Sequence, residues 1–399
     1  MIKKMKVIIL MVLITISFSI SNCKGGKSDS NIIKIGVLIP LSHGYGKSIK
    51  QGMDLAVKEI NEKGLLNGKK LELIYEDSAF NPKQSIIKTK KLLARDKVKF
   101  FIGGLTSGVT KAIAGITKTY KPIMVWGGAA STGVEKLYEG INWFFHLHPW
   151  TYHNVSETVS FFKSTKAKTV AILYEDGEFG TDGSKVAEGF LKKENFKIVL
   201  KTSFKSGEGK FEPILTKIKT VNPDILYVTC YGKDVTPLVK QMRNLNVNVK
   251  CVYLSPPSWP SEFTKMKISN FITGLVVWAP GIELKESKEF IKRFKAEFNR
   301  IPQLYWAPMG YVNVKVIAQA IKKAGSLDKA ALIKALEQTD MATPMGRLTF
   351  KPSRVAKNQG FTRLVSFQWL NCGKMTVVFP KKIAAKEAVY PMPNWKERK

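Results

Sequence analysis

Short apolar runs alternate with longer segments of helical spacing from residue 32 onward. Each run is rich in β-branched residues and predicts a buried strand, the first four being IIKIGVLIPL, KLELIYED, VKFFIGG and PIMVWGGAAS. The first intervening segment has apolar residues three or four positions apart and ends at Gly64, a residue favoured just after a helix. The second opens with Asn81 and Pro82, which suit a helix N-terminus. This order predicts a parallel sheet with helices on both faces.

The same alternation restarts after residue 150 and predicts a second α/β lobe. Its strands are expected at four runs separated by helical segments: KTVAILYED, KIVLKTSF, PDILYVTCYG and KCVYLSP. The chain is expected to leave this lobe near GLVVWAPG. Three helices then follow, and the tail predicts a hairpin that turns at residues 371–373.

Length and charge narrow the class of protein. The chain has 399 residues, which suits two domains of ordinary size. Lys and Arg number 64 against 31 Asp and Glu, a net charge of +33. Such a balance can indicate a nucleic-acid partner. The lysines are scattered through every segment instead of gathered in one block, so we favour a basic surface and expect no nucleic acid.

The N-terminus has the pattern of an export signal. The basic MIKKMK precedes the apolar VIILMVLITISFSI, which is too short for a comfortable membrane span. Cys23 follows in a context that resembles the lipobox of bacterial lipoproteins. This resemblance implies a signal peptide over residues 1–22, a lipid on Cys23 and a tether over residues 23–31. The alternative is an ordinary signal peptide, with Cys23 incidental.

Cysteine usage leaves one structural alternative open. Three cysteines remain after Cys23, and an exported chain can join two of them in a disulfide: Cys230, Cys251 and Cys372. No C-x-x-C motif occurs, so a zinc ribbon is not expected.

The segments that end the predicted strands are rich in glycine, hydroxyl and aromatic residues. Ligands of open parallel sheets lie at the carboxyl ends of the strands, and these residue types suit a small organic ligand. In FFIGGLTSGVT, Gly103 and Gly108 have the spacing of a phosphate-binding loop, but Val109 stands where that loop needs lysine. The loop therefore predicts contact with a carboxylate or a similar group, not with a nucleotide.

The sequence offers little material for catalysis or metal binding. It contains four histidines and neither a nucleophile elbow nor a zinc-protease motif. His146 and His148 form an H-x-H pair, which we interpret as partly exposed residues of a crossover strand. Trp259 and Trp306 are interpreted as core residues, because large aromatic side chains are usually buried, and the alternative is that they line the cleft. We expect no enzyme activity, no cofactor and no metal.

The ordered segments together resemble the leucine/isoleucine/valine-binding protein family, the type I periplasmic solute-binding proteins of ABC importers. The resemblance is carried by IKIGVLIPLSHGYGKSIKQGMDLAVKEINEKG, FFIGGLTSGVTKA, PIMVWGGAAST, AILYEDGEFGTDGSKVAEGFLKK, DILYVTCYG and MGRLTFKP. It implies an α/β fold of two Rossmann-like lobes with parallel central sheets and a three-segment hinge. The first lobe would comprise 32–148 plus 278–357, and the second 149–277 plus 358–399.

The resemblance also implies ligand contacts on the first lobe. The loop GGLTSG would offer the Ser107 hydroxyl and backbone N–H groups to a ligand carboxylate, with Leu105 and Thr106 beside it. The loop GGAAST would supply the Ala129 carbonyl and the Ser131 hydroxyl.

Further contacts are implied from the other loops. Phe179 and Tyr231 would close over the ligand from the second lobe, and Tyr45 is a candidate aromatic wall in a loop shorter than usual. Pro257 occupies the position where the amino-acid binders of the family place an acidic residue that neutralises the ligand ammonium. An ammonium would then need another acceptor, the candidates being Glu175, Asp176 and Asp234. Otherwise the ligand is an amide, a keto acid or an aromatic carboxylate.

These implications lead to one expected function and two alternatives. The expectation is a monomeric, lipid-anchored solute-binding protein on the outer side of a bacterial membrane. It would close by a hinge on a small molecule and then dock on ABC transporter permease subunits. The alternatives are a ligand-sensing module that needs a partner output protein, and a basic surface adhesin on the same scaffold.

Overall fold

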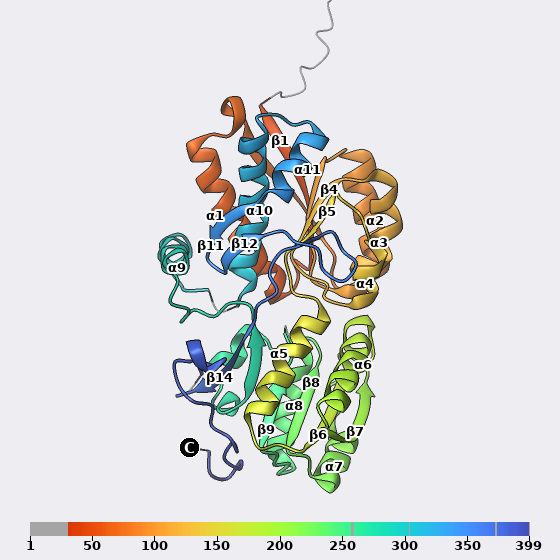
Figure 1. Cartoon of the computed structure of the whole chain (residues 1–399), viewed down its shortest axis with the longest axis vertical. Coiled ribbons are helices and arrows are strands. Elements are labelled where there is room, and N and C mark those ends of the chain that lie inside the picture. Colours follow the sequence, from red (N-terminus) through yellow and green to blue (C-terminus); the bar gives the residue numbers. More distant parts are fainter. Residues whose placement is uncertain (1–30, 257–258, 303, 372, 399) are drawn as a thin grey trace, which may run out of the picture.

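Two α/β lobes lie end to end in the computed structural model, which describes residues 31–256, 259–302, 304–371 and 373–398 (Figure 1). The expected signal peptide, Cys23, Pro257 and Cys372 lie outside the described residues. Within the described part of the chain, no helix combines the length and apolar character needed to cross a bilayer.

The first lobe is built on a six-stranded sheet in the order β13-β5-β4-β3-β1-β2. All neighbouring strands in it are parallel, as the alternation of strand and helix predicts. The strands are β1 (Ile32–Ile39), β2 (Lys70–Asp77), β3 (Phe100–Gly103), β4 (Ile123–Trp126), β5 (Phe144–His146) and β13 (Asn358–Gln359).

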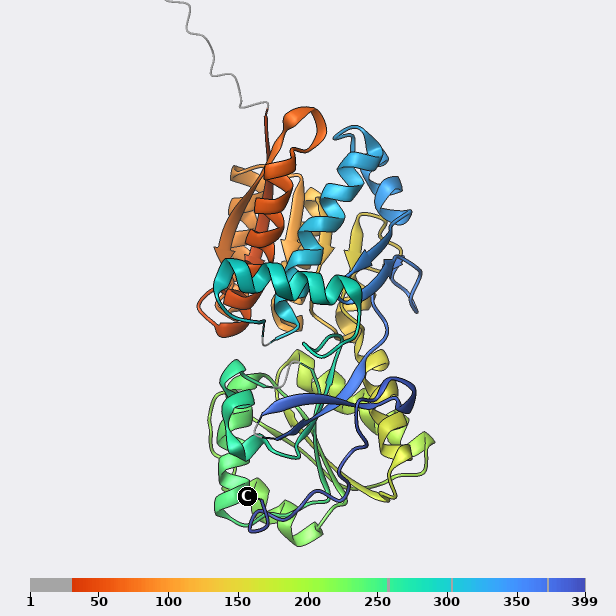
Figure 2. The ribbon, with the colours of Figure 1, turned by 90° about the vertical axis from the view of Figure 1, so that its left-hand side faces the viewer.

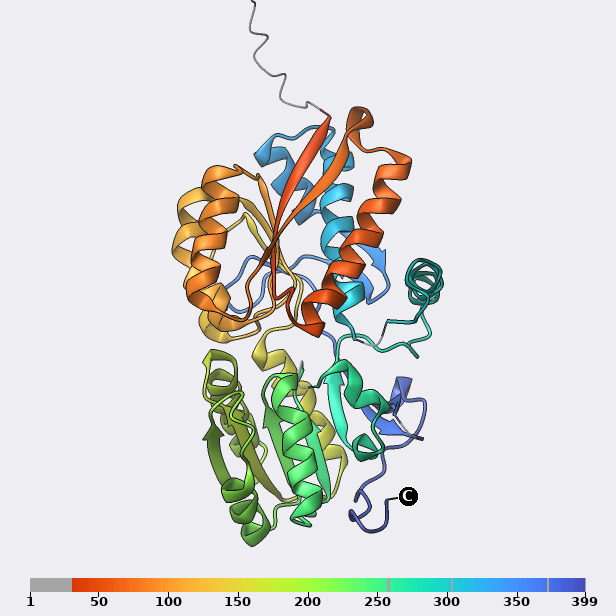
Figure 3. The same cartoon turned by 180° about the vertical axis from the view of Figure 1, so that it is seen from behind.

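Helices cover both faces of this sheet (Figures 1 and 3). One face carries α1 (Gly44–Lys63) and α10 (Trp306–Ala324), and the other carries α2 (Pro82–Lys90), α3 (Ser107–Tyr120) and α4 (Thr132–Leu137). Helix α9 (Lys285–Phe298) crosses the outside of the lobe, as Figure 2 shows. The lobe is completed by α11 (Lys329–Glu337) and the hairpin of β11 (Asp340–Thr343) and β12 (Gly346–Thr349).

The second lobe has a seven-stranded sheet in the order β15-β14-β10-β9-β8-β6-β7. Its parallel strands are β6 (Thr169–Glu175), β7 (Lys197–Phe204), β8 (Ile225–Thr229), β9 (Cys251–Leu254) and β10 (Thr273–Val276). The predicted C-terminal hairpin, β14 (Val365–Leu370) with β15 (Lys374–Phe379), adds antiparallel strands at one edge. The helices are α5 (Thr151–Ser164), α6 (Glu178–Lys193), α7 (Glu212–Val221) and α8 (Gly232–Asn244).

The remaining helical elements are single turns. They are the 3-10 turns Leu66–Gly68, Ser261–Lys265, Lys267–Ser269 and Lys381–Ile383, and the π turn Lys91–Arg95 that continues α2.

Three segments carry the chain between the lobes: 147–150, 277–284 and 360–364. The first sheet extends two residues past the expected boundary at residue 357, because Asn358 and Gln359 pair with Phe145 and His146 of β5.

The interpretation of the histidine pair as partly exposed is wrong. His146 and His148 are 0% and 2% exposed, because His146 ends β5, an inner strand of the first sheet, and His148 follows in the buried start of the connecting segment. Burial lowers the pKa of His146 to about 3 and that of His148 to about 4. Among the described residues, no group of three or more His, Cys, Asp and Glu side chains is placed to hold a metal ion.

Burial also describes Trp259 and the two cysteines Cys230 and Cys251. Trp259 packs against Phe367 and Trp369 in the second lobe, so the core interpretation holds for it. Cys230 and Cys251 are both buried, and no disulfide joins them in the described part of the chain.

Candidate functional site

The carboxyl ends of the strands of both lobes meet where the lobes touch (Figures 1 and 3). From the first lobe come the loops after β1, β2, β3 and β4, and from the second the loops after β6, β8 and β9. This is the edge of a parallel sheet at which ligands usually bind.

The loop after β3 brings a helix N-terminus to the boundary. Gly103 and Gly104 have φ angles of 122° and 78°, and they turn the chain from β3 towards the start of α3. Thr106 is the N-cap residue of α3, yet its side chain accepts no capping hydrogen bond from the described residues. Ser107 is fully buried, and its Oγ accepts a hydrogen bond from the backbone N–H of Ser131 at 3.2 Å. The N–H groups of this helix end therefore lie at the lobe boundary, where they favour an anion.

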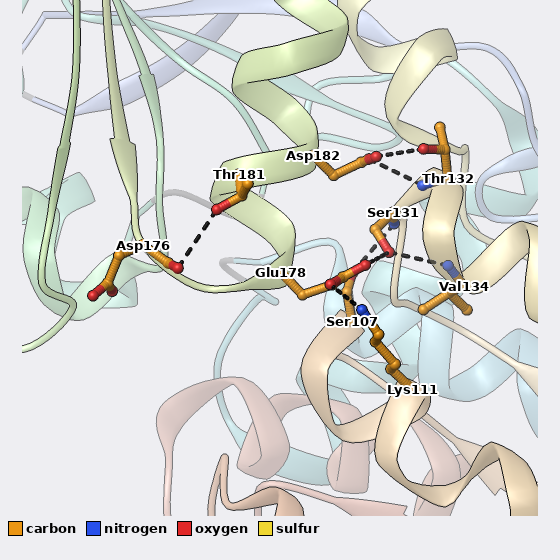
Figure 4. Close-up of polar contacts among 9 residues, drawn as sticks. All are labelled: Ser107, Lys111, Ser131, Thr132, Val134, Asp176, Glu178, Thr181 and Asp182. Atoms are coloured by element: carbon orange, nitrogen blue, oxygen red, sulfur yellow. Dashed lines mark hydrogen bonds and ion pairs between the residues drawn. The ribbon is translucent and has the colours of Figure 1, made fainter.

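The loop after β4 runs beside that helix end. Ala129 has a left-handed φ of 70°, and its N–H donates to the Leu105 carbonyl at 3.0 Å. The Ser131 hydroxyl accepts the Val134 N–H at 3.2 Å and so caps α4 (Figure 4). The two loops that the sequence singled out on the first lobe are thus hydrogen-bonded to each other.

Phe179 and Tyr231 reach the same place from the second lobe. Their ring centroids are 5.3 Å apart, and both residues border a cavity of about 10 Å³, which has room for roughly one water. Burial raises the pKa of Tyr231 well above its usual value. The cavity is lined by residues from both lobes: Leu105, Ala129, Ala130, His148, Phe179, Tyr231, Pro256 and Trp306.

A larger pocket also borders Tyr231. Its volume is about 180 Å³, and it is lined by His43, Gly44, Tyr45, Phe80, Tyr231, Lys233, Pro260, Glu262 and Leu304. The Phe80 ring stands edge-on to Tyr231 with centroids 5.5 Å apart. Sequence reasoning missed Phe80 at this place. The available signal was its position in the loop at the carboxyl end of β2.

Tyr45 joins the two lobes directly. Its hydroxyl donates to the Trp259 carbonyl at 3.0 Å and accepts the Gly232 N–H at 2.8 Å. A Cβ atom at Gly232 would overlap this hydroxyl, so the contact depends on a glycine there. Tyr45 therefore lines the larger pocket, as the aromatic-wall prediction requires, and also bridges the lobes.

The three candidate carboxylates are hydrogen-bonded within the second lobe, Glu175 to its own loop and the other two to the loop after β7. Glu175 accepts the N–H groups of Gly177 at 2.6 Å and Gly180 at 2.7 Å, and burial raises its pKa. Asp234 accepts the Gly207 N–H at 2.7 Å and the Ser206 hydroxyl at 2.8 Å. Asp176 is exposed and accepts the Ser206 N–H at 3.3 Å.

The geometry brings together most of the predicted residues. Four of them line the small cavity, namely Leu105, Ala129, Phe179 and Tyr231, while Thr106, Ser107 and Ser131 form the adjoining helix end. Tyr45 lines the larger pocket. Trp306 is buried, as expected of a core residue, but it also borders the small cavity.

Known proteins are similar to this chain in sequence and fold. Residues 32–371 match the family model described as periplasmic binding protein. The Leu/Ile/Val-binding protein homolog 7 of Brucella abortus is 24% identical over 94% of this chain and 98% of its own length. The leucine-, isoleucine-, valine-, threonine- and alanine-binding protein of Pseudomonas aeruginosa is 24% identical over 80% of this chain and 84% of its own.

Two solved structures show the fold with ligands in place. The branched-chain amino acid substrate-binding protein of Streptococcus pneumoniae in complex with isoleucine is 23% identical, with a TM-score of 0.77 over 88% of this chain and 100% of that one. A solute-binding protein from R. palustris in complex with benzoate is 17% identical, with a TM-score of 0.78 over 90% and 99%. The two-lobe fold and the extent of the family match lead to one conclusion: the chain belongs to the periplasmic binding proteins of the leucine/isoleucine/valine-binding type.

Proposed function

We propose that this protein is the extracytoplasmic solute-binding component of an ABC importer and that it binds a small carboxylate between its lobes. The observation that carries the proposal is the shared cavity, in which Leu105 and Ala129 of the first lobe face Phe179 and Tyr231 of the second. Hinge motion at the three connecting segments would open this boundary, admit the ligand and close around it.

The start of α3 is the proposed carboxylate site. Its N–H groups, together with the hydroxyl of Ser107, supply donors for an anion at a helix N-terminus. The rings of Phe179 and Tyr231 would then cover the apolar part of the ligand.

The chemistry of the second lobe favours a ligand without an ammonium group. The oxygens of Glu175 already accept hydrogen bonds from its own loop, and those of Asp234 accept them from the loop after β7. A buried ammonium without a partner carboxylate costs several kcal/mol. We therefore place an aromatic or branched aliphatic carboxylate ahead of an α-amino acid. Benzoate in one structural relative and isoleucine in another mark these two classes.

A ligand screen tests the proposal. Thermal unfolding would be measured with isoleucine, leucine, benzoate, hydroxybenzoates and branched keto acids, and each hit followed by calorimetric titration. Ser107→Ala and Phe179→Ala are expected to weaken binding of the hit, since they remove a donor and a ring wall. Unchanged affinity in both variants would exclude this site.

The proposed membrane anchor has a separate test. Cells that express the chain would be labelled with a radioactive fatty acid, and label is expected in the wild type but not in Cys23→Ser. Equal labelling, or labelling of neither, would contradict lipidation at Cys23 and favour an ordinary signal peptide.

A further inference from the structure

A second set of polar contacts joins the lobes beside the candidate ligand site. It lies between the first turn of α6 in the second lobe and the starts of α3 and α4 in the first (Figure 4). At its outer end, the Asp182 carboxylate accepts two hydrogen bonds from Thr132, one from the backbone N–H at 3.0 Å and one from the hydroxyl. One aspartate thus holds both donors of a single residue in the opposite lobe.

Glu178 makes the inner half of the same contact. Its Oε2 forms an ion pair with the Lys111 ammonium at 2.8 Å, and its Oε1 accepts the Ser131 hydroxyl at 3.3 Å. Glu178 and Asp182 are four residues apart in α6, so both carboxylates project from one face of the helix (Figure 4). Together, Glu178 and Asp182 contact α3, the loop after β4 and α4.

A glycine makes room for this approach. A Cβ atom at Gly133 in α4 would lie 2.5 Å from Glu178 Oε1, closer than real Cβ atoms come to oxygen. The backbone of Gly133 is helical and would accept alanine without strain. The lack of a side chain at this position leaves room for the carboxylate end of Glu178 beside α4.

We infer that Glu178 and Asp182 form a latch that stabilises the closed arrangement of the lobes and so sets ligand affinity without touching the ligand. This inference rests on the proposed function, because a closed state matters only if closure accompanies binding. Neither carboxylate lines the small cavity or the larger pocket.

The latch acts on one state alone. When the lobes separate, its donors and acceptors return to water, so its net free energy favours the closed state only. The apparent affinity of a ligand scales with the fraction of protein in the binding-competent state. A protein with a stronger latch releases its ligand more slowly, which matters for the moment of transfer to a transporter.

The first experiment examines the ligand-free protein, so it does not depend on knowing the ligand. Asp182→Asn keeps the shape but loses one acceptor oxygen, and Glu178→Gln loses the ion pair with Lys111. Small-angle scattering would compare the radius of gyration of each variant with that of the wild type. Hydrogen exchange would follow the peptide that contains the Thr132 amide, which donates to Asp182. The matched control is Glu188→Gln on the same helix, because Glu188 pairs with Lys192 and Lys201 inside the second lobe.

The latch predicts a clear pattern in these data. Asp182→Asn and Glu178→Gln are expected to enlarge the radius of gyration and to speed exchange at Thr132 by about tenfold or more, the size typical of a lost charge-assisted hydrogen bond. Glu188→Gln should leave both unchanged. Wild-type scattering that matches separated lobes, or variants indistinguishable from the wild type, would overturn the inference.

Gly133→Ala separates a latch from a merely structural role. Alanine is the better helix former and should preserve or raise thermal stability, yet it crowds Glu178 and should shift the ligand-free protein towards the open form. A variant that is equally closed would contradict the inference. If no carboxylate or amino acid binds while these shifts are seen, the proposed function fails and the latch stands.

Discussion

Removing one oxygen from Tyr45 should weaken closure of the lobes without disturbing either lobe. Tyr45→Phe deletes the hydroxyl that bonds to the Trp259 carbonyl and the Gly232 N–H across the boundary. The ring keeps its packing, with its centroid 6.3 Å from that of Trp306 and 6.5 Å from that of Phe80. In the open form the hydroxyl would bond to water, so its loss acts mainly on the closed form.

The size of the effect follows from the two bonds. Each intramolecular hydrogen bond contributes about 1 kcal/mol net, so the closed form should lose about 2 kcal/mol. Since a tenfold change corresponds to roughly 1.4 kcal/mol, the Kd of a ligand held by closure should rise by about 30-fold. Tyr45 is only 7% exposed, so the buried Gly232 N–H would be left without this acceptor, which adds to the loss.

Calorimetric titration of the strongest ligand from the thermal screen would measure the change in Kd. Tyr75→Phe is the matched control, because the Tyr75 hydroxyl donates to Asp54 at 2.7 Å within the first lobe. The control should lower the free energy of unfolding and leave Kd unchanged. The reasoning is refuted if Tyr45→Phe binds as tightly as the wild type, or if Tyr75→Phe weakens binding equally.

Two further predictions concern stability. His146 and His148 have pKa values of about 3 and about 4 in the folded protein, below the usual 6.5. As the pH falls below 6.5, the unfolded chain therefore binds more protons than the folded protein does. Stability is lost between pH 6.5 and about 4. From pH 7 to pH 5 the free energy of unfolding should fall by about 2 kcal/mol for each histidine. The raised pKa of Glu175 acts in the opposite sense and offsets part of this loss. Urea unfolding at the two pH values measures the change, and equal or greater stability at pH 5 would contradict the prediction. Gly104→Ala should lower the melting temperature markedly, because Gly104 has a φ of 78° and a Cβ atom there would overlap the Trp126 ring. A melting temperature like that of the wild type would contradict this prediction and show that the turn can relax.

The local pattern of the sequence was enough for most of the fold. The strand expected at KIVLKTSF is β7 with the same bounds, Lys197–Phe204, and the hairpin expected in the tail is β14 and β15. Period-2 and period-3.6 patterns report which face of an element is buried, and that information is local. The six-residue helix α4 and the two-residue strand β13 escaped prediction, because so short a segment holds too few positions to show a period.

The sequence by itself determined the two α/β lobes and the strand ends at which a ligand can bind. The tertiary structure decided which loops face each other across the boundary. Thr132 and Asp182 are 50 residues apart, and Tyr45 and Gly232 are 187 apart, so no periodicity relates them. Their contacts exist only because three connecting segments orient one sheet against the other, and that orientation depends on packing summed over both lobes. The resemblance to the family implied Ser107, Phe179 and Tyr231 as one site, whereas Glu178 could be proposed as a latch residue only from its contacts in three dimensions.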